Sequence, residues 1–134
     1  MFFVGVSCFN VSFVFMLAMT WNVRGLGSRE KRRFVRSLVY KHQPTVFILQ
    51  ETKLSSIDRG IISSLGGTIL SRGMCVDANG LIGGLVTLWN DNFFLVKDCI
   101  SNQRCIILVG VLLRINKEVV FCNVYTANVE NERK

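Results

Sequence analysis

Three polar side chains follow apolar runs of this sequence, and their types suit the chemistry of a phosphate site. Glu51 comes directly after "TVFILQ", Asn22 ends an apolar run of residues 13–22, and Tyr125 ends "EVVFCNVY". A carboxylate at the end of a strand can bind a hard cation such as Mg2+ through oxygen. A nearby amide can orient a metal ligand or hydrogen-bond a phosphate oxygen, and a phenol can donate to one.

Each of these residues also has a plainer interpretation. Glu51 can be an ordinary carboxylate that pairs with Lys53 or with an arginine. Asn22 can be a turn-forming residue, and Tyr125 a half-buried aromatic whose hydroxyl lies in water. His42 is the only histidine, and its place at a predicted helix end suits the helix dipole rather than the role of a base.

The elements that must hold the amide and the carboxylate are a strand, a helix and a second strand. Residues 13–22 and 45–50 have the apolar, β-branched composition of buried strands. Between them, Ser28 can cap a helix that runs to about Lys41. If the two strands are parallel neighbours in one sheet, both polar side chains emerge at the same edge.

The predicted helix carries most of the positive charge. The net charge is +7, and residues 24–41 hold seven basic side chains and one acid, which is +6. Phe34, Val35, Leu38 and Val39 repeat at helical spacing and are expected to form the inner face. A basic outer face suits a nucleic acid or an anionic membrane, and a solvated arginine-rich face is the alternative. The candidate nucleic-acid-binding residues are Arg24, Arg29, Arg32, Arg33 and Arg36.

The rest of the chain predicts one weaker helix and then strands. The helix covers residues 57–65, and the strand-like runs are "GGLVTLWN", "FFLVKDCI", "CIILVGVLLRI" and "EVVFCNVYTAN". Short polar pairs between them can form tight turns, which predicts an antiparallel meander. The predicted fold class is therefore mixed α/β, or α+β, within a single modest domain.

The first twenty residues carry no charge and allow two interpretations. Their length can span a bilayer, and the basic residues that follow obey the positive-inside tendency. Their aromatic and β-branched residues suit a buried strand equally well. Five cysteines without a CxxC pair argue against a disulfide scaffold or structural zinc. We expect an intracellular, reducing location in the nucleus or cytoplasm, with a membrane location through residues 1–20 as the alternative.

The order of the motifs resembles the endonuclease/exonuclease/phosphatase superfamily. "WNVRGLG", the basic helix, "VFILQETKL", "GGLVTLWN" and "FCNVY" follow one another over about residues 19–128, most like the endonuclease domain of plant LINE-type, non-LTR retroelements. The resemblance implies a sandwich of two β-sheets flanked by helices, which hydrolyses phosphate esters with Mg2+ or Mn2+. It also implies nucleic acid, DNA above all, as the partner of the parent domain, whereas the sequence leaves the choice among DNA, RNA and small phosphate esters open. It also implies that Glu51 binds the metal, that Asn22 lies near metal and phosphate, and that Tyr125 contacts the scissile phosphate.

The sequence departs from the family's pattern after its tyrosine. The family continues into a Gly-Asp-x-Asn segment and ends with an Asp-His pair, which hold and activate the attacking water. Residues 126–134 contain neither Asp nor His. We therefore expect a partial sandwich with a weak metal site, exposed sheet edges and no activity of the chain alone. The expected division is an apolar extension of residues 1–14 and a partial domain of residues 15–134.

Overall fold

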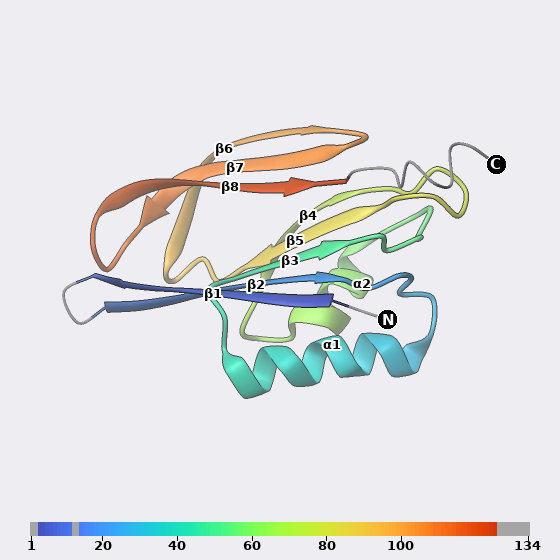
Figure 1. Ribbon diagram of the computed structural model, residues 1–134, viewed down its shortest axis with the longest axis horizontal. Coiled ribbons are helices and arrows are strands. Elements are labelled where there is room, and N and C mark those ends of the chain that lie inside the picture. The colour runs from blue at the N-terminus through green and yellow to red at the C-terminus, as the bar shows by residue number, and fades with distance from the viewer. Residues whose placement is uncertain (1–2, 12–13, 126–134) are drawn as a thin grey trace.

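A computed structural model describes the backbone of residues 3–11 and 14–125 and the side chains of residues 16–125. Two β-sheets stack on each other, and both helices lie on the outer side of one of them (Figure 1). The elements are β1 Phe3–Val11, β2 Val14–Asn22, α1 Arg29–His42, β3 Val46–Gln50, α2 Arg59–Gly66, β4 Arg72–Val76, β5 Leu85–Trp89, β6 Phe94–Asn102, β7 Cys105–Leu112 and β8 Lys117–Val124. The predicted fold class, a mixed α/β partial sandwich, is confirmed.

The first sheet has the strand order β1-β2-β3-β5-β4. β2 and β3 are parallel, and α1 is the crossover between them, as the sequence predicts. β1 pairs with β2 along its whole length, so part of the predicted extension is an edge strand of this sheet. The division at residue 14 stays a prediction. None of the helices in the described part of the chain is long and apolar enough to cross a membrane.

The second sheet contains only β6, β7 and β8, which form an antiparallel meander. The predicted four-stranded meander is wrong for its first strand, because β5 pairs with β3 and β4 in the first sheet. The turn between β5 and β6 therefore carries the chain from one sheet to the other. The cause is long-range: both edges of β5 are already paired, so β6 cannot join it.

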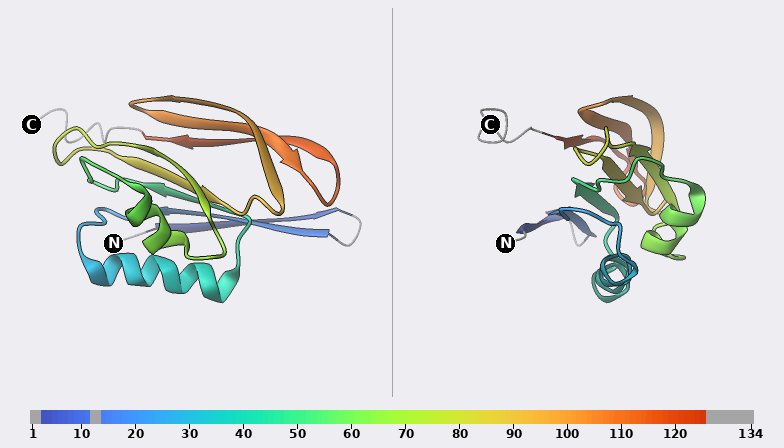
Figure 2. Two further views of the ribbon diagram at one scale, coloured as in Figure 1. Left: turned by 180° about the vertical axis from the view of Figure 1, so that it is seen from behind. Right: turned by 90° about the vertical axis from the view of Figure 1, so that its right-hand side faces the viewer.

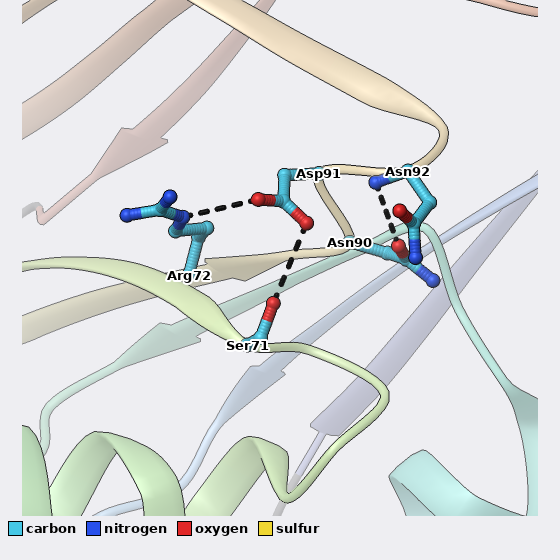
Figure 3. A network of polar contacts seen from close by, with 5 residues as sticks. All are labelled: Ser71, Arg72, Asn90, Asp91 and Asn92. Carbon is cyan, nitrogen blue, oxygen red and sulfur yellow. Dashed lines mark hydrogen bonds and ion pairs between the residues drawn. The ribbon is translucent and has the colours of Figure 1, made fainter.

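Polar contacts fix this sheet-switching turn (Figure 3). The carboxylate of Asp91 accepts from Arg72 Nε at 3.1 Å and from Ser71 Oγ at 3.5 Å, which ties the turn to the start of β4. Within the turn, Asn90 Oδ1 accepts from the backbone N–H of Asn92 at 3.0 Å. The turn thus holds its shape through both side-chain and local backbone contacts.

Replacing Arg72 with alanine should change stability little. The side chains of its ion pair with Asp91 are 66% and 39% exposed, and such pairs contribute about 0–1 kcal/mol because water screens them. We expect the free energy of unfolding in urea to fall by less than about 1 kcal/mol. A larger loss would show that the turn depends on this pair more than its exposure implies.

Local signals explain α1. Ser28 Oγ accepts from the backbone N–H of Lys31 at 3.2 Å, which is the expected N-cap, and Gln43 ends the helix with φ of 48°. Val35 and Val39 are buried against the first sheet. Phe34 departs from the predicted inner face, because it is 47% exposed and meets Trp21 edge-on at 5.4 Å.

Two hydrophobic cores result from this layering. The first lies between the helices and the five-stranded sheet, and its largest buried side chains include Trp21, Phe47 and Leu49. The second lies between the two sheets and contains Phe94 and Ile106. Alternate residues of β7 are buried, as expected for a strand with one face on a core.

Candidate functional site

β2, β3 and β8 all run toward the same end of the molecule (Figure 1). Asn22 is the last residue of β2 and pairs with Gln50, so Glu51 follows at the neighbouring position of the sheet edge. The expectation that these two strands are parallel neighbours ending together is confirmed. Tyr125 directly follows β8 in the second sheet. We call this region, with Asn22, Glu51 and Tyr125, the strand-end site.

Backbone hydrogen bonds continue the sheet beyond the strand ends and hold three loop segments together. Backbone N–H groups within residues 23–26 donate hydrogen bonds to the carbonyls of residues 50–52, with N···O distances of 2.7–3.0 Å. Residues 52 and 53 in turn bond to Gly84 and Gly83 at 3.1 and 2.9 Å. These segments are far apart in sequence, so their pairing builds the strand-end site as one connected backbone surface.

Left-handed backbone conformations gather in the same segments. Arg24, Glu51 and Lys53 have φ of 51°, 54° and 56°, and Gly83 and Gly84 have φ of 79° and 90°. A residue with a Cβ in this region costs roughly 1–2 kcal/mol and persists only where surrounding contacts enforce it. Such residues cluster at functional sites, which favours the functional interpretation of Glu51.

Glu51 is half-buried and forms no ion pair with any described residue. The plainer interpretation, a pair with Lys53 or a helix arginine, therefore finds no support among the described residues. Its carboxylate oxygens remain available to a cation.

Asn22 makes the turn-forming contact that its plainer interpretation predicts, and its role near metal and phosphate stays a prediction. Its Oδ1 accepts from the backbone N–H of Arg24 at 3.3 Å, which is a turn-forming contact. An amide oxygen has a second lone pair, and the Asn22 Nδ2 has no hydrogen-bond partner among the described residues. The turn contact thus orients the amide without using all its capacity.

The acidic residues described at this end do not form a cluster of several metal-binding side chains. The described residues contain no group of three or more His, Cys, Asp or Glu side chains that could hold a metal. Mg2+ often binds through one or two carboxylates and keeps several waters. Glu51 supplies one such carboxylate at the end of β3.

Tyr125 lies beside the strand ends and lines an adjacent cavity of about 460 Å3. Its backbone N–H donates to the carbonyl of Arg104 at 2.8 Å, and a Cβ added to Gly83 would lie 3.8 Å from its ring. Asp77 and Arg104 also line this cavity, whereas Asn22 and Glu51 do not. The loop that contains Glu51 is joined to the cavity lined by Tyr125 through the hydrogen bond from the backbone N–H of Lys53 to the carbonyl of Gly83.

The sequence analysis missed the two charged residues of this cavity. Asp77 directly follows β4, whose sequence "RGMCV" lacks a clear strand pattern, so its position at a strand end was not recognisable. Arg104 lies in the turn between β6 and β7 and reaches the cavity only because the second sheet stacks on the first. Only three-dimensional packing brings them to Tyr125.

Asn123 is a second residue that the sequence analysis missed, and it ties the two sheets together. Its side chain is 1% exposed, and its Nδ2 donates to the carbonyls of Leu49 and Val86 at 3.1 Å. It also donates to Thr87 Oγ1 at 3.2 Å. Because it lies two residues before Tyr125 and contacts the strand that leads to Glu51, it sets the position of β8 relative to β3.

The candidate nucleic-acid-binding arginines divide into two groups. Arg24, Arg29, Arg33 and Arg36 are exposed, and the last three share the solvent side of α1. Arg32 is half-buried, and its Nη1 donates to the carbonyls of Leu26 and Gly27 at 2.8 and 2.9 Å. Arg32 therefore closes the loop that follows β2, and this structural role was not predicted.

Tyr40, on the same helix, should titrate below its ordinary range. Hydrogen bonds from Thr68, with a further contribution from Arg36, lower the pKa of Tyr40 from 10.0 to about 8 because they stabilise the phenolate. A spectrophotometric titration should show one phenolate transition near pH 8, absent in Tyr40→Phe and moved toward 10 in Thr68→Ala. A wild-type titration with no transition below pH 9 would contradict this contact.

The chain is similar to proteins of one known family. The family model for the endonuclease/exonuclease/phosphatase family matches residues 19–131, which include every residue of the strand-end site. None of the curated proteins matches significantly. Among solved structures, the AP endonuclease LMAP from Leishmania major is similar, with a TM-score of 0.62 and 20% identity. The catalytic domain of Xenopus laevis APE2 is similar with a TM-score of 0.61 and 14% identity.

At these identities the structural likeness shows the fold alone. The matches cover 83% and 87% of this chain but only 40% and 46% of the two solved chains. The chain thus spans less than half the length of the solved structures it resembles. Because the family model covers most of the sequence, the chain belongs to the endonuclease/exonuclease/phosphatase family.

Proposed function

We propose that this chain is the metal-holding part of an endonuclease-like phosphodiesterase domain and that it does not cleave by itself. The observation that carries the proposal is the parallel register of β2 and β3, which sets Glu51 beside the end of β2 where Asn22 lies. The substrate that we propose for the parent domain is DNA, because the similar solved structures include an AP endonuclease.

Each residue of the strand-end site has its own role in this proposal. Glu51 holds Mg2+ or Mn2+ through a carboxylate oxygen, and the amide of Asn22, fixed by Arg24, orients the ligand sphere or a phosphate oxygen. Family members generally depend on divalent metal, and such a cation supplies Lewis-acid polarisation of a phosphoryl oxygen. Tyr125 donates its phenolic proton in a hydrogen bond to the phosphate.

The proposed lack of activity concerns this chain alone and rests on the side chains that it contains. A single carboxylate binds Mg2+ weakly, and residues 126–134 contain no Asp or His that could activate water. His42 is the last residue of α1 and lies a few residues before the start of β3, so it is at the opposite end of that strand from Glu51. The chain therefore offers no histidine at the strand-end site.

Two measurements on variants of Glu51 test the two parts of this proposal. In a plasmid-nicking assay with Mg2+, wild type and Glu51→Ala should give the same background, and nicking by wild type alone would overturn the claim of inactivity. Mn2+ binding followed by electron paramagnetic resonance should weaken at least tenfold in Glu51→Gln. Equal Mn2+ binding by both proteins would overturn the metal site.

We further propose that the chain is of retroelement origin, related to the endonuclease domain of plant LINE-type elements. The support is the pair "WNVRGLG" and "LQETKL" at their present separation. Genomic sequence that follows codon 134 provides the test. Codons for Asp-x-Asn and Asp-His motifs there, in frame or after a frameshift, are expected, and unrelated sequence would contradict this origin.

Nucleic-acid binding through α1 is a second candidate function, favoured by the exposed arginines on one side of that helix. Each phosphate contact with duplex DNA contributes a slope of about −0.9 to the dependence of log K on log salt. We expect the slope to become about two units shallower in an Arg33→Ala, Arg36→Ala variant. Arg59→Ala with Lys117→Ala removes the same charge elsewhere and should leave the slope nearly unchanged. A slope of log K against log salt near zero for the wild type would contradict nucleic-acid binding through α1.

The membrane alternative and the reducing intracellular location both remain proposals. Carbonate extraction of a tagged protein tests the first, since release into the soluble fraction would rule out a span through residues 1–20. Fractionation of the same cells into nuclear, cytoplasmic and secreted material tests the second.

A further inference from the structure

A cavity of about 250 Å3 lies at the end of the molecule opposite the strand-end site. It is lined by Met16 and Leu17 near the start of β2 and by Thr45 just before β3, so the length of both strands separates it from Asn22 and Glu51. In the left view of Figure 2 the turn between β7 and β8, which also lines it, lies on the right, whereas β8 ends on the left. We call this space the rear cavity.

The inner wall of the rear cavity is apolar. Met16 and Leu112 are buried, and Leu17 and Ile115 are half-buried. Such walls bind the apolar part of a small ligand, because burial removes that part from water. At about 30 Å3 for each water-sized group, the rear cavity holds roughly eight non-hydrogen atoms. It therefore fits a small molecule and excludes a polynucleotide.

The rim of the rear cavity is basic. Arg114 and His42 both line it and are exposed, and no described residue of the lining is acidic. Neither side chain forms an ion pair with a described residue. The last turn of α1 also contains Lys41, and basic residues there offset the partial negative charge of the helix end. The rim thus favours an anionic group over a cationic one.

The guanidinium of Arg114 is held in place by an aromatic ring. Its Cζ lies 4.7 Å from the ring centroid of Phe93, which also lines the rear cavity. A stacked guanidinium keeps the N–H groups along its edge available, and two of them match the two oxygens of a carboxylate. Because the stacking fixes the side chain before a ligand arrives, less conformational entropy is lost on binding.

Thr45 supplies a second, independent indication of a ligand. It is 9% exposed, and its side-chain hydroxyl forms no hydrogen bond with a described residue. Its backbone is already fixed, since its N–H donates to the Leu17 carbonyl and its carbonyl accepts from the N–H of Asn90, both at 2.9 Å. A buried hydroxyl without a partner costs free energy. An acceptor atom of a ligand in the rear cavity would remove this cost.

We propose that the rear cavity binds a small amphiphilic carboxylate. The apolar body lies against the inner wall, the carboxylate pairs with Arg114 at the rim, and the hydroxyl of Thr45 donates a hydrogen bond to the bound molecule. A neutral molecule of the same shape would leave Arg114 unpaired, and a cation would be repelled by it. This binding does not depend on metal or on the strand-end site.

The test uses octanoate and the full chain. The seven carbons beyond its carboxylate, at about 30 Å3 each, fit within the rear cavity. For a ligand of this size we expect a dissociation constant between about 1 μM and 1 mM by titration calorimetry. In amide spectra of the isotopically labelled chain, octanoate should shift the signals of residues 16–17, 42–43 and 112–115. The signals of Asn22 and Glu51 should stay unchanged.

Two variants separate the charge of the rim from the hydroxyl of the wall. Arg114→Gln should weaken octanoate binding about tenfold or more and change the affinity for octanol less than twofold, because octanol has no charge to pair. Thr45→Val keeps the shape but removes the hydroxyl, and should weaken octanoate binding about threefold to tenfold. Arg59→Gln removes an exposed positive charge on α2, outside the lining, and should change the affinity less than twofold.

Four results would overturn the proposal. The first is no binding of octanoate at millimolar concentration, and the second is equal affinity for octanoate and octanol. The third is an unchanged affinity in Arg114→Gln, or signal shifts centred on Asn22 and Glu51 instead of the rear cavity. The fourth is much tighter binding of octyl phosphate than of octanoate, which would make a phosphate the recognised group.

Discussion

Asn123→Asp should destabilise the fold by at least about 3 kcal/mol at pH 7. The substitution keeps the shape of the side chain but replaces the amide donor with a carboxylate oxygen. That oxygen would face the carbonyls of Leu49 and Val86, which are acceptors, in a place that is 1% exposed. A buried charge among acceptors is costly, because desolvation and repulsion act together. Urea denaturation followed by circular dichroism measures the loss.

The pH dependence gives this prediction a second test. Burial and the facing carbonyls should raise the pKa of the introduced carboxyl, and its protonated form can again donate a hydrogen bond. A raised folded-state pKa means that stability is lost as pH rises. The variant should therefore regain part of its stability relative to wild type between pH 7 and pH 5.

Asn102→Asp is the matched control in the same sheet. Asn102 Oδ1 accepts from the backbone N–H groups of Arg104 and Cys105 at 2.8 and 3.0 Å, and the residue is exposed. A carboxylate preserves both contacts, so we expect a change within about 0.5 kcal/mol. Similar losses in both variants would show that Asn123 does not tie the sheets together.

Gly84→Ala should be strongly destabilising, with a loss of about 2–4 kcal/mol. Gly84 has φ of 90°, and a Cβ there would overlap the Oγ1 of Thr52. Thr52 is fully buried, and its backbone N–H bonds to the Gly84 carbonyl at 3.1 Å, so it cannot move away cheaply. The free-energy costs of backbone strain and of overpacking therefore add in this variant.

Two other glycines separate these contributions. Gly80 also has a left-handed φ, 64°, but a Cβ there has no neighbour within 4 Å, so Gly80→Ala should cost only about 1 kcal/mol of strain. Gly27 has open space and no such φ, and Gly27→Ala should be nearly neutral. Thermal and urea unfolding of the three variants should give this order. Equal losses at Gly84 and Gly80 would contradict the close approach of Thr52.

The first half of the fold was predictable because its signals are local. The capping residue Ser28 and the spacing of Val35 and Val39 predict α1, and apolar runs predict β2 and β3. Their parallel pairing followed from the strand-helix-strand order, and with it the shared edge of Asn22 and Glu51. Glu51 could thus be placed, although its left-handed backbone depends on contacts with the loops beside it.

The remaining features depend on contacts between distant segments. β4 contains Arg72 and Gly73 and has no buried residue, so its strand pattern is weak, and pairing with β5 decides its conformation. Asn123 resembles any polar residue in a strand until the second sheet stacks over β3 and β5. Arg32 cannot be distinguished from its neighbours until the loop after β2 turns back toward it.

Paramagnetic broadening by Mn2+ tests the strand-end site most directly. In amide spectra of the isotopically labelled chain, low concentrations of Mn2+ should broaden the signals of residues 22–25 and 51–53 first, with Gly83 and Gly84 next. Glu51→Gln should abolish this pattern while the fold remains intact. Broadening centred elsewhere, or the same pattern in Glu51→Gln, would contradict the assignment of a metal site to the ends of β2 and β3.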